Sequence, residues 1–277
     1  MGKFDQFKNG LAKLGRGENL PARSDDSATS NPLLTAARQL SADRLQEREI
    51  DRSKSAHFAI ALDATGSMAT LLQSAKASLS EIIRRVTHEA GRPIKIQLFA
   101  YRDYDCGPQV LESSSLSGDA NNLIAWLSRV EAMGGGSNDG EAIEFALGHI
   151  KTLGGFRSII IAGDEPPNGQ VFLASQGRAQ SQTAQQLAAR FGADKTPIHT
   201  FVVGDHGPTI IAFREIADAS GGKSGRLDGS AAMIDMAVLA MLATLKGKQG
   251  VRDYVARTAL TSNAAAFATL LLGDSSK

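Results

Sequence analysis

The chain has 277 residues, of which 42% are hydrophobic and 21% charged, and its formal net charge is +1. This length accommodates one large domain or two small ones, and the near-neutral balance gives no electrostatic case for binding nucleic acid. The single cysteine, Cys106, excludes an internal disulfide framework and a cysteine zinc cluster. No apolar stretch reaches the roughly 18 uncharged residues of a spanning helix, and the N-terminus lacks a signal-peptide core. We expect a soluble, cytoplasmic protein without a membrane partner.

The first 50 residues predict a helical extension and a linker. Apolar residues between Phe4 and Leu14 form a stripe on a short helix, which either packs on its own domain or docks on a partner or a membrane surface. Residues 15–30 are polar and rich in turn formers. Asn31 followed by Pro32 then predicts the start of a second helix.

From residue 56 onward, short apolar runs alternate with helical patterns. The strand candidates are Phe58–Leu62, Ile94–Tyr101, Ser158–Ala162 and Ile198–Val203, with Gln109–Glu112 and Gly222–Leu227 as weaker ones. The helix candidates are Met68–Ala90, Ala120–Val130, Gly140–Leu153, Arg178–Phe191, Ile210–Ala219 and Ala231–Lys246. This alternation predicts an α/β domain over residues 56–247, with a doubly wound, mainly parallel sheet and helices on both faces. Residues 248–277 are expected to form a helical tail.

The turn after the first strand carries three side chains with oxygen atoms. Asp63, Thr65 and Ser67 stand within the sequence DATGS, between an apolar strand and a helical pattern. One hydroxyl could simply cap the helix, which is a common role of serine and threonine. A cap needs only one oxygen, however, and this turn offers three, so a binding site is a second interpretation.

Further oxygen-rich segments follow the other strands: YRDYD at 101–105, GGGSNDGE at 134–141 and GDEPP at 163–167. Ligands of open parallel sheets bind at the carboxyl ends of the strands. Carboxylate, hydroxyl and carbonyl oxygens suit hard cations rather than zinc or copper. We therefore expect a divalent metal site that binds Mg²⁺, with Mn²⁺ or Ca²⁺ as alternatives.

Two structural interpretations of these loops remain open. Asp139 could be the N-cap of the helix predicted to begin at residue 140, where it would stabilise the positive helix end. Asp103 and Asp105 could belong to a solvated loop in which Arg102 pairs with one of them. The alternative to that loop is that Asp103 accepts a hydrogen bond from a group that itself contacts the metal.

These segments resemble a von Willebrand factor A domain, and the resemblance covers about residues 56–247. The family's metal-ion-dependent adhesion site begins Asp-x-Ser-x-Ser, which matches Asp63, Thr65 and Ser67 with threonine in the middle place. The family also has an aspartate after its fourth strand, and Asp164 follows the apolar run IIIA here. The run FAYRDYD is similar to segments of intracellular bacterial and alpha-kinase-associated members.

The glycine-rich loop departs from the family pattern. Asp139 stands where the family has a threonine ligand, and Ser137 is a second candidate for that role. The resemblance therefore implies a metal site formed by Asp63, Thr65, Ser67, Asp139 and Asp164. The aspartate could hold the metal tightly while weakening its attraction for a partner carboxylate.

The resemblance implies binding without chemistry. In the family, the metal keeps an open coordination position that an aspartate or glutamate of a protein partner fills. We therefore expect a non-enzymatic interaction module that captures an acidic residue within an intracellular bacterial complex. A metal-dependent phosphohydrolase is one alternative, because magnesium and aspartates also serve phosphoryl transfer. A passive scaffold with a degenerate metal site is another.

Overall fold

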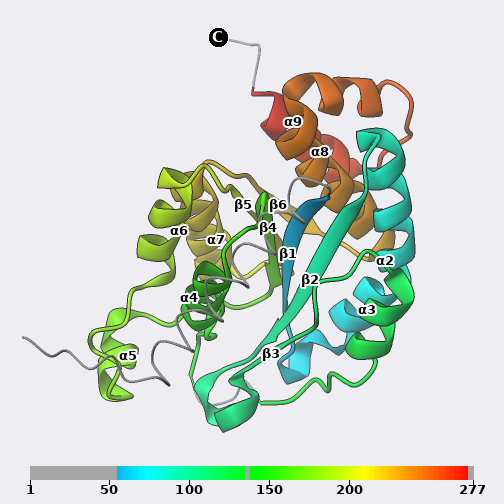
Figure 1. Cartoon of the computed structure of the whole chain (residues 1–277). Coiled ribbons are helices and arrows are strands. Elements are labelled where there is room, and N and C mark those ends of the chain that lie inside the picture. The colour runs from blue at the N-terminus through cyan, green and yellow to red at the C-terminus, as the bar shows by residue number, and fades with distance from the viewer. Residues whose placement is uncertain (1–54, 135–137, 274–277) are drawn as a thin grey trace, which may run out of the picture. The chain divides into compact units, whose positions relative to one another are not determined.

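The computed structural model describes residues 55–134 and 138–273. The helices expected within residues 1–50 and the candidate ligand Ser137 lie outside the described residues. Six strands form one sheet in the order β3-β2-β1-β4-β5-β6 (Figure 1). Their bounds are β1 Ala56–Asp63, β2 Ile94–Tyr101, β3 Leu111–Ser113, β4 Ser158–Gly163, β5 Ile198–Val203 and β6 Ser224–Leu227. Only the short edge strand β3 pairs antiparallel, so the expected doubly wound, mainly parallel sheet is confirmed.

Strand β1 lies at the centre of the sheet and all eight of its residues are buried. It pairs in parallel with β2 on one side and with β4 on the other. Phe58, Ile60 and Leu62 point into one hydrophobic cluster, whereas Ala59 and Ala61 belong to the cluster on the opposite face. A strand that is buried on both faces reads as a continuous apolar run, which explains why the sequence pattern identified it.

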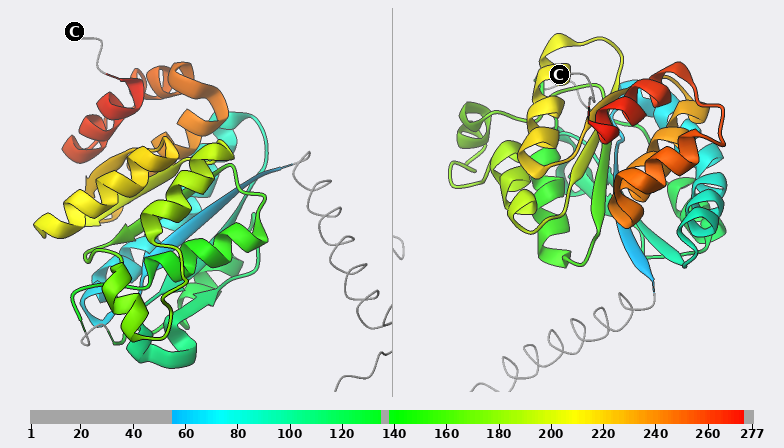
Figure 2. Two further views of the ribbon diagram at one scale, coloured as in Figure 1. Left: turned by 90° about the vertical axis from the view of Figure 1, so that its left-hand side faces the viewer. Right: turned by 90° about the horizontal axis from the view of Figure 1, so that it is seen from above.

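Helices cover both faces of the sheet, as Figure 2 shows from above. One layer contains α2 Ala69–Ala90, α3 Ala120–Leu127 and α8 Ser230–Val255, with α9 Ser262–Leu272 packed on α8 and β6. The other contains α4 Ile143–Leu153, α6 Ala184–Ala193 and α7 Gly207–Ser220. The short helix α5 Gln170–Ser175 lies in the connection between β4 and α6. Two 3-10 turns, η1 Gly66–Met68 and η2 Tyr104–Val110, follow β1 and β2.

Several predicted helix ends were wrong for local reasons. Helix α6 begins at Ala184 rather than near residue 178, because Thr183 forms a capping box with Gln186. Helix α8 continues past Lys246 to Val255 through a kink at Gly247, whose φ of 64° interrupts the helical backbone. The short helix α5 was not predicted at all.

Helix α8 is long and apolar enough to cross a membrane, judged by its length and composition alone. It is nevertheless a core helix of the described chain, because residues from Ala232 to Leu242 pack into the cluster that includes β1 and α2. Helix α9 completes this cluster through Phe267, whose ring meets those of Phe201 at 5.4 Å and His199 at 5.9 Å. Apolar composition here reflects burial in the protein core.

Buried His199 should make the protein sensitive to acid. Its Nδ1 atom accepts a hydrogen bond from the Lys223 amide, its Nε2 atom has no hydrogen-bond partner among the described residues, and burial lowers its pKa to about 4. A base with a depressed pKa contributes stability above the unfolded pKa near 6.5, and this stability is lost as the pH falls towards 4. The loss is on the order of 3 kcal/mol.

The variant His199→Asn tests this expectation, because it keeps an acceptor for the Lys223 amide but cannot gain a proton. Urea unfolding between pH 7 and 4 should show a shallower loss of unfolding free energy for the variant than for the parent protein. Equal slopes would show that His199 does not cause the acid sensitivity.

Candidate metal centre

The site lies where the order of the strands reverses, between β1 and β4. Asp63 is the last residue of β1, and Asp164 directly follows Gly163 at the end of β4. Gly163 permits this close approach: a Cβ atom there would lie 2.4 Å from the Tyr101 hydroxyl and 3.0 Å from Asp63 Oδ2. The sheet thus brings two predicted ligands together from residues that are about 100 positions apart, at the edge where open sheets bind ligands.

Asp63 and Thr65 form the best-defined part of the turn after β1. The Asp63 side chain is fully buried, and its Oδ1 atom accepts hydrogen bonds from the Thr65 amide at 2.8 Å and from the Thr65 hydroxyl at 2.6 Å. The hydroxyl oxygens of Thr65 and Ser67 lie 3.5 Å apart. Neither hydroxyl caps η1 or α2, so the plain capping interpretation was wrong.

Two buried carboxylate oxygens at this position have no hydrogen-bond partner among the described residues: Asp63 Oδ2 and Asp164 Oδ1. Burial, together with the neighbouring Asp164, raises the pKa of Asp63 to about 7 against the opposing effect of the Thr65 hydrogen bonds. The backbone of Asp164 is held by the Thr209 hydroxyl, which donates to its carbonyl oxygen at 2.6 Å. The pair is therefore fixed in place but electrostatically uncompensated.

Glu141 is a third buried acid near this pair, and it is not among the residues predicted from the sequence. Its Oε2 atom also has no hydrogen-bond partner in the described chain. Burial raises its pKa to about 9, with further contributions from the charges of Asp63, Asp103 and Asp164. The Glu141 amide donates to the Pro166 carbonyl, and Glu141 forms a parallel bridge with Pro167 just beyond β4, which fixes this acid at the rim. In the sequence, Glu141 stands out only as the last residue of the glycine-rich segment GGGSNDGE at 134–141.

Asp139, the predicted ligand from the glycine-rich loop, is not joined to the acid pair by the contacts of the described residues. Asp139 is exposed. Helix α4 begins at Ile143 with Ala142 as its N-cap, so the interpretation of Asp139 as a helix cap was wrong. Its role as a ligand stays a prediction.

The acidic loop after β2 is not the solvated loop considered above. Asp103 is fully buried and accepts a hydrogen bond from the Asn168 side chain at 3.0 Å, whereas Asp105 is exposed. Buried Arg102 forms an ion pair of 2.8 Å with Glu112 and donates to backbone carbonyls. Its guanidinium group is thus engaged by Glu112 in β3 and by the carbonyls of Gln109 and Glu131.

The residues present fit a hard divalent cation better than a soft one. Within the described residues, no group of three or more histidine, cysteine, aspartate or glutamate side chains is arranged to hold a metal. The available set instead combines the unpartnered oxygens of Asp63 and Asp164 with the Ser67 hydroxyl, which is exposed. Such a set leaves positions for water or a ligand oxygen, as is usual for Mg²⁺.

No protein-family model matches the chain. A curated relative, an ariadne-like RING finger protein of Acanthamoeba polyphaga mimivirus, is 29% identical over 148 residues. The match covers 53% of this chain but only 14% of the relative's length, so the chain spans a small part of that protein.

Three solved structures are similar to this chain. The SpRpn10 VWA domain is 12% identical with a TM-score of 0.48, covering 67% of this chain and 94% of its own. A von Willebrand factor type A protein from Catenulispora acidiphila is 16% identical with a TM-score of 0.48, and the match covers 69% of this chain and 43% of that protein's chain. An aerotolerance-related membrane protein from Bacteroides fragilis is 13% identical with a TM-score of 0.47, and the match covers 68% of this chain and 98% of that protein's chain. At these scores the likenesses carry no argument of their own, and the fold assignment rests on the sheet order described above.

Proposed function

We propose that this chain, whose doubly wound domain is of the von Willebrand factor A type, is a divalent-metal-dependent interaction module that captures an acidic residue of a protein partner. The observation that supports it is the pair of buried, unpartnered carboxylate oxygens on Asp63 and Asp164. Buried acids without partners are costly, and a bound cation would offset that cost. The resemblance of the motif to the family's adhesion site points the same way.

In this proposal Asp63, Ser67 and Asp164 hold Mg²⁺, and Thr65 and Asp139 complete the predicted set. The ion supplies a positive charge that attracts a carboxylate of the partner. The residues of the chain have separate tasks: Thr65 fixes the orientation of the Asp63 carboxylate through two hydrogen bonds, and Thr209 fixes the backbone of Asp164. Mn²⁺ and Ca²⁺ are alternative ions of the same ligand preference.

We further propose that the module has no enzymatic activity and works in the bacterial cytoplasm. A phosphohydrolase needs a cation to hold the phosphate and a base to activate the attacking water. At the described part of the rim, Arg102 is engaged by Glu112 and by backbone carbonyls, which favours binding over hydrolysis.

A passive scaffold is the second candidate function. It is favoured by the lack of any three-residue acidic or histidine metal group among the described residues. It is also favoured by the Thr65 hydroxyl, which already donates to Asp63 at 2.6 Å. A scaffold would interact through its surface in the same way with or without metal.

A pull-down with the tagged full chain separates the two functions. We expect the captured partner to be released by EDTA and recaptured when excess Mg²⁺ is added, because the ion forms the contact. Asp164→Asn should lose the partner in the presence of Mg²⁺, whereas the exposed control Asp105→Asn should retain it. Capture that survives both EDTA and Asp164→Asn would support the scaffold.

A further inference from the structure

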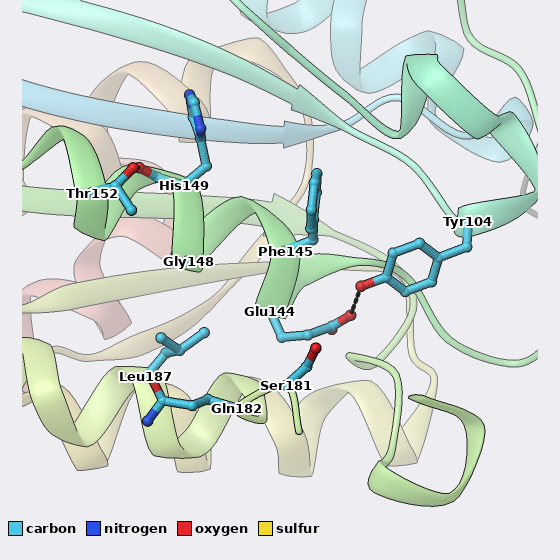
Figure 3. Close-up of a pocket in the computed structure, with 9 residues that line it drawn as sticks. All are labelled: Tyr104, Glu144, Phe145, Gly148, His149, Thr152, Ser181, Gln182 and Leu187. Atoms are coloured by element: carbon cyan, nitrogen blue, oxygen red, sulfur yellow. Dashed lines mark hydrogen bonds between the residues drawn. The ribbon is translucent and has the colours of Figure 1, made fainter. Parts of the chain in front are cut away.

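A pocket, here called the Tyr104 pocket, opens between η2, α4 and the segment that leads into α6 (Figure 3). Its volume is about 300 Å³. Tyr104, Glu144, Phe145, His149 and Gln182 are among the residues that line it. None of them belongs to the predicted metal ligand set, so this pocket is a separate feature of the domain.

An acid with an unused oxygen lies in the Tyr104 pocket. Glu144 is only 3% exposed, and its Oε1 atom accepts a hydrogen bond from the Tyr104 hydroxyl at 2.7 Å (Figure 3). Its Oε2 atom has no hydrogen-bond partner among the described residues. Burial of a carboxylate without a donor is unfavourable, so Oε2 is available to a ligand that brings a donor and a positive charge.

Aromatic rings stand next to this acid. The rings of Tyr104 and Phe145 meet edge to face with their centroids 6.1 Å apart, and Phe172 stacks on the Tyr104 ring at 6.3 Å. Aromatic faces carry negative charge density and attract cations, the planar guanidinium group in particular. An acid beside two aromatic faces is therefore suited to a cationic ligand.

An arginine of the chain itself already uses the aromatic half of the site. The guanidinium carbon of Arg178 lies 4.4 Å from the centroid of the Tyr104 ring and 5.4 Å from that of Phe145. Within the described residues it forms no ion pair with Glu144, whose Oε2 atom stays unpartnered. Arg178 thus shows that a guanidinium fits the rings, while the acid remains unsatisfied.

We propose that the Tyr104 pocket binds the guanidinium group of an arginine on a protein partner, and that Arg178 is an internal placeholder which this arginine displaces. The incoming group stacks on Tyr104 and donates hydrogen bonds to Glu144 Oε2, two contacts that Arg178 does not make together. This binding goes beyond the metal-dependent capture of an acidic residue and does not need the ion. Arginine is preferred to lysine because only its planar group stacks and donates at once.

The probe for this proposal is Nα-acetyl-arginine methylamide, titrated into the full chain in EDTA and followed by NMR. We expect Glu144→Gln to weaken binding by about tenfold or more, because it removes the charge but keeps an acceptor for the Tyr104 hydroxyl. Arg178→Ala should tighten binding by roughly threefold or more, because it removes the internal competitor. Arg157→Ala, which removes the same charge from an exposed position at the start of β4, should leave binding unchanged.

Two further measurements make the result decisive. The lysine analogue of the probe should bind more weakly than the arginine probe, and thermal unfolding should confirm that each variant is folded. Equal binding by the parent protein and Glu144→Gln would overturn the proposal, and so would the failure of Arg178→Ala to tighten binding. Absence of binding to both the parent protein and Arg178→Ala would overturn it as well. Asp63→Asn should bind the probe normally, which keeps this test separate from that of the metal site.

Discussion

Replacing Asp63 by asparagine is expected to weaken Mg²⁺ binding by about 100-fold or more, since the variant loses the charge of a central ligand. Asparagine keeps an oxygen that can accept from the Thr65 amide and hydroxyl, so the turn after β1 should retain its shape. Calorimetric titration of the parent protein and the variant with Mg²⁺ measures the effect.

The stability of the same variant provides its own control. Because Asp63 is buried beside Asp164 and its pKa is raised to about 7, its ionised form is unfavourable in the metal-free protein. Asp63→Asn should therefore be at least as stable as the parent protein in EDTA at pH 8. Loss of Mg²⁺ binding together with equal or higher stability would exclude misfolding as its cause. Asp105→Asn, which neutralises an exposed acid in η2, should bind Mg²⁺ as the parent does.

In the metal-free protein, buried Asp63 should make a contribution to stability that is lost as the pH rises from 4 to above 7. An acid with a raised folded-state pKa binds more protons in the folded than in the unfolded protein between the two pKa values, so stability falls as the pH rises through this window. For Asp63, with a pKa that burial raises from 3.8 to about 7, the loss is on the order of 4 kcal/mol. Glu141, with a pKa of about 9, extends the fall to more alkaline pH.

Urea unfolding between pH 4 and 9, in EDTA and in excess Mg²⁺, measures this dependence. Mg²⁺ should add more stability at pH 8 than at pH 5, because the ion binds the ionised carboxylates and stabilises only the folded state. His199 has the opposite sign below pH 6.5, so the contribution of Asp63 is read as the difference between the parent protein and Asp63→Asn. A Mg²⁺ effect that is equal at both pH values would contradict the assigned acids.

The arrangement of the strands was predictable because the central strands are short apolar runs buried on both faces, as in β1. The positions of the candidate ligands Asp63 and Asp164 were predictable for the same reason, since Asp63 ends β1 and Asp164 directly follows β4. The place of Glu141 was not predictable, because it is set by a hydrogen bond from its amide to the Pro166 carbonyl, a contact between segments that are separated in sequence.

Individual hydrogen bonds, one local and one between distant segments, account for two further differences between sequence and structure. The capping box of Thr183 set the start of α6, although apolar spacing alone extended the helix to residue 178. Asp103 looked like part of a polar loop, yet Asn168 from a distant segment donates to it in the interior. Side chains that are satisfied by residues far away in sequence leave no periodic signal.

The burial of Glu144 in the Tyr104 pocket also could not be predicted from the sequence. Glu144 lies in the first turn of α4, where an acid is ordinarily an exposed partner of the positive helix end. Its burial follows from Tyr104 in η2, which covers it and donates to it. A functional interpretation of Glu144 therefore required the three-dimensional contact.

The most direct test of the account is a crystal structure of the full chain grown with Mn²⁺, with anomalous scattering used to locate the ion. We expect an anomalous peak for one Mn²⁺ ion at the carboxyl ends of β1 and β4, with the ion coordinated by oxygen atoms of Asp63, Ser67 and Asp164. A structure in which these three side chains bind no ion at saturating Mn²⁺, and pair with other protein groups instead, would contradict it.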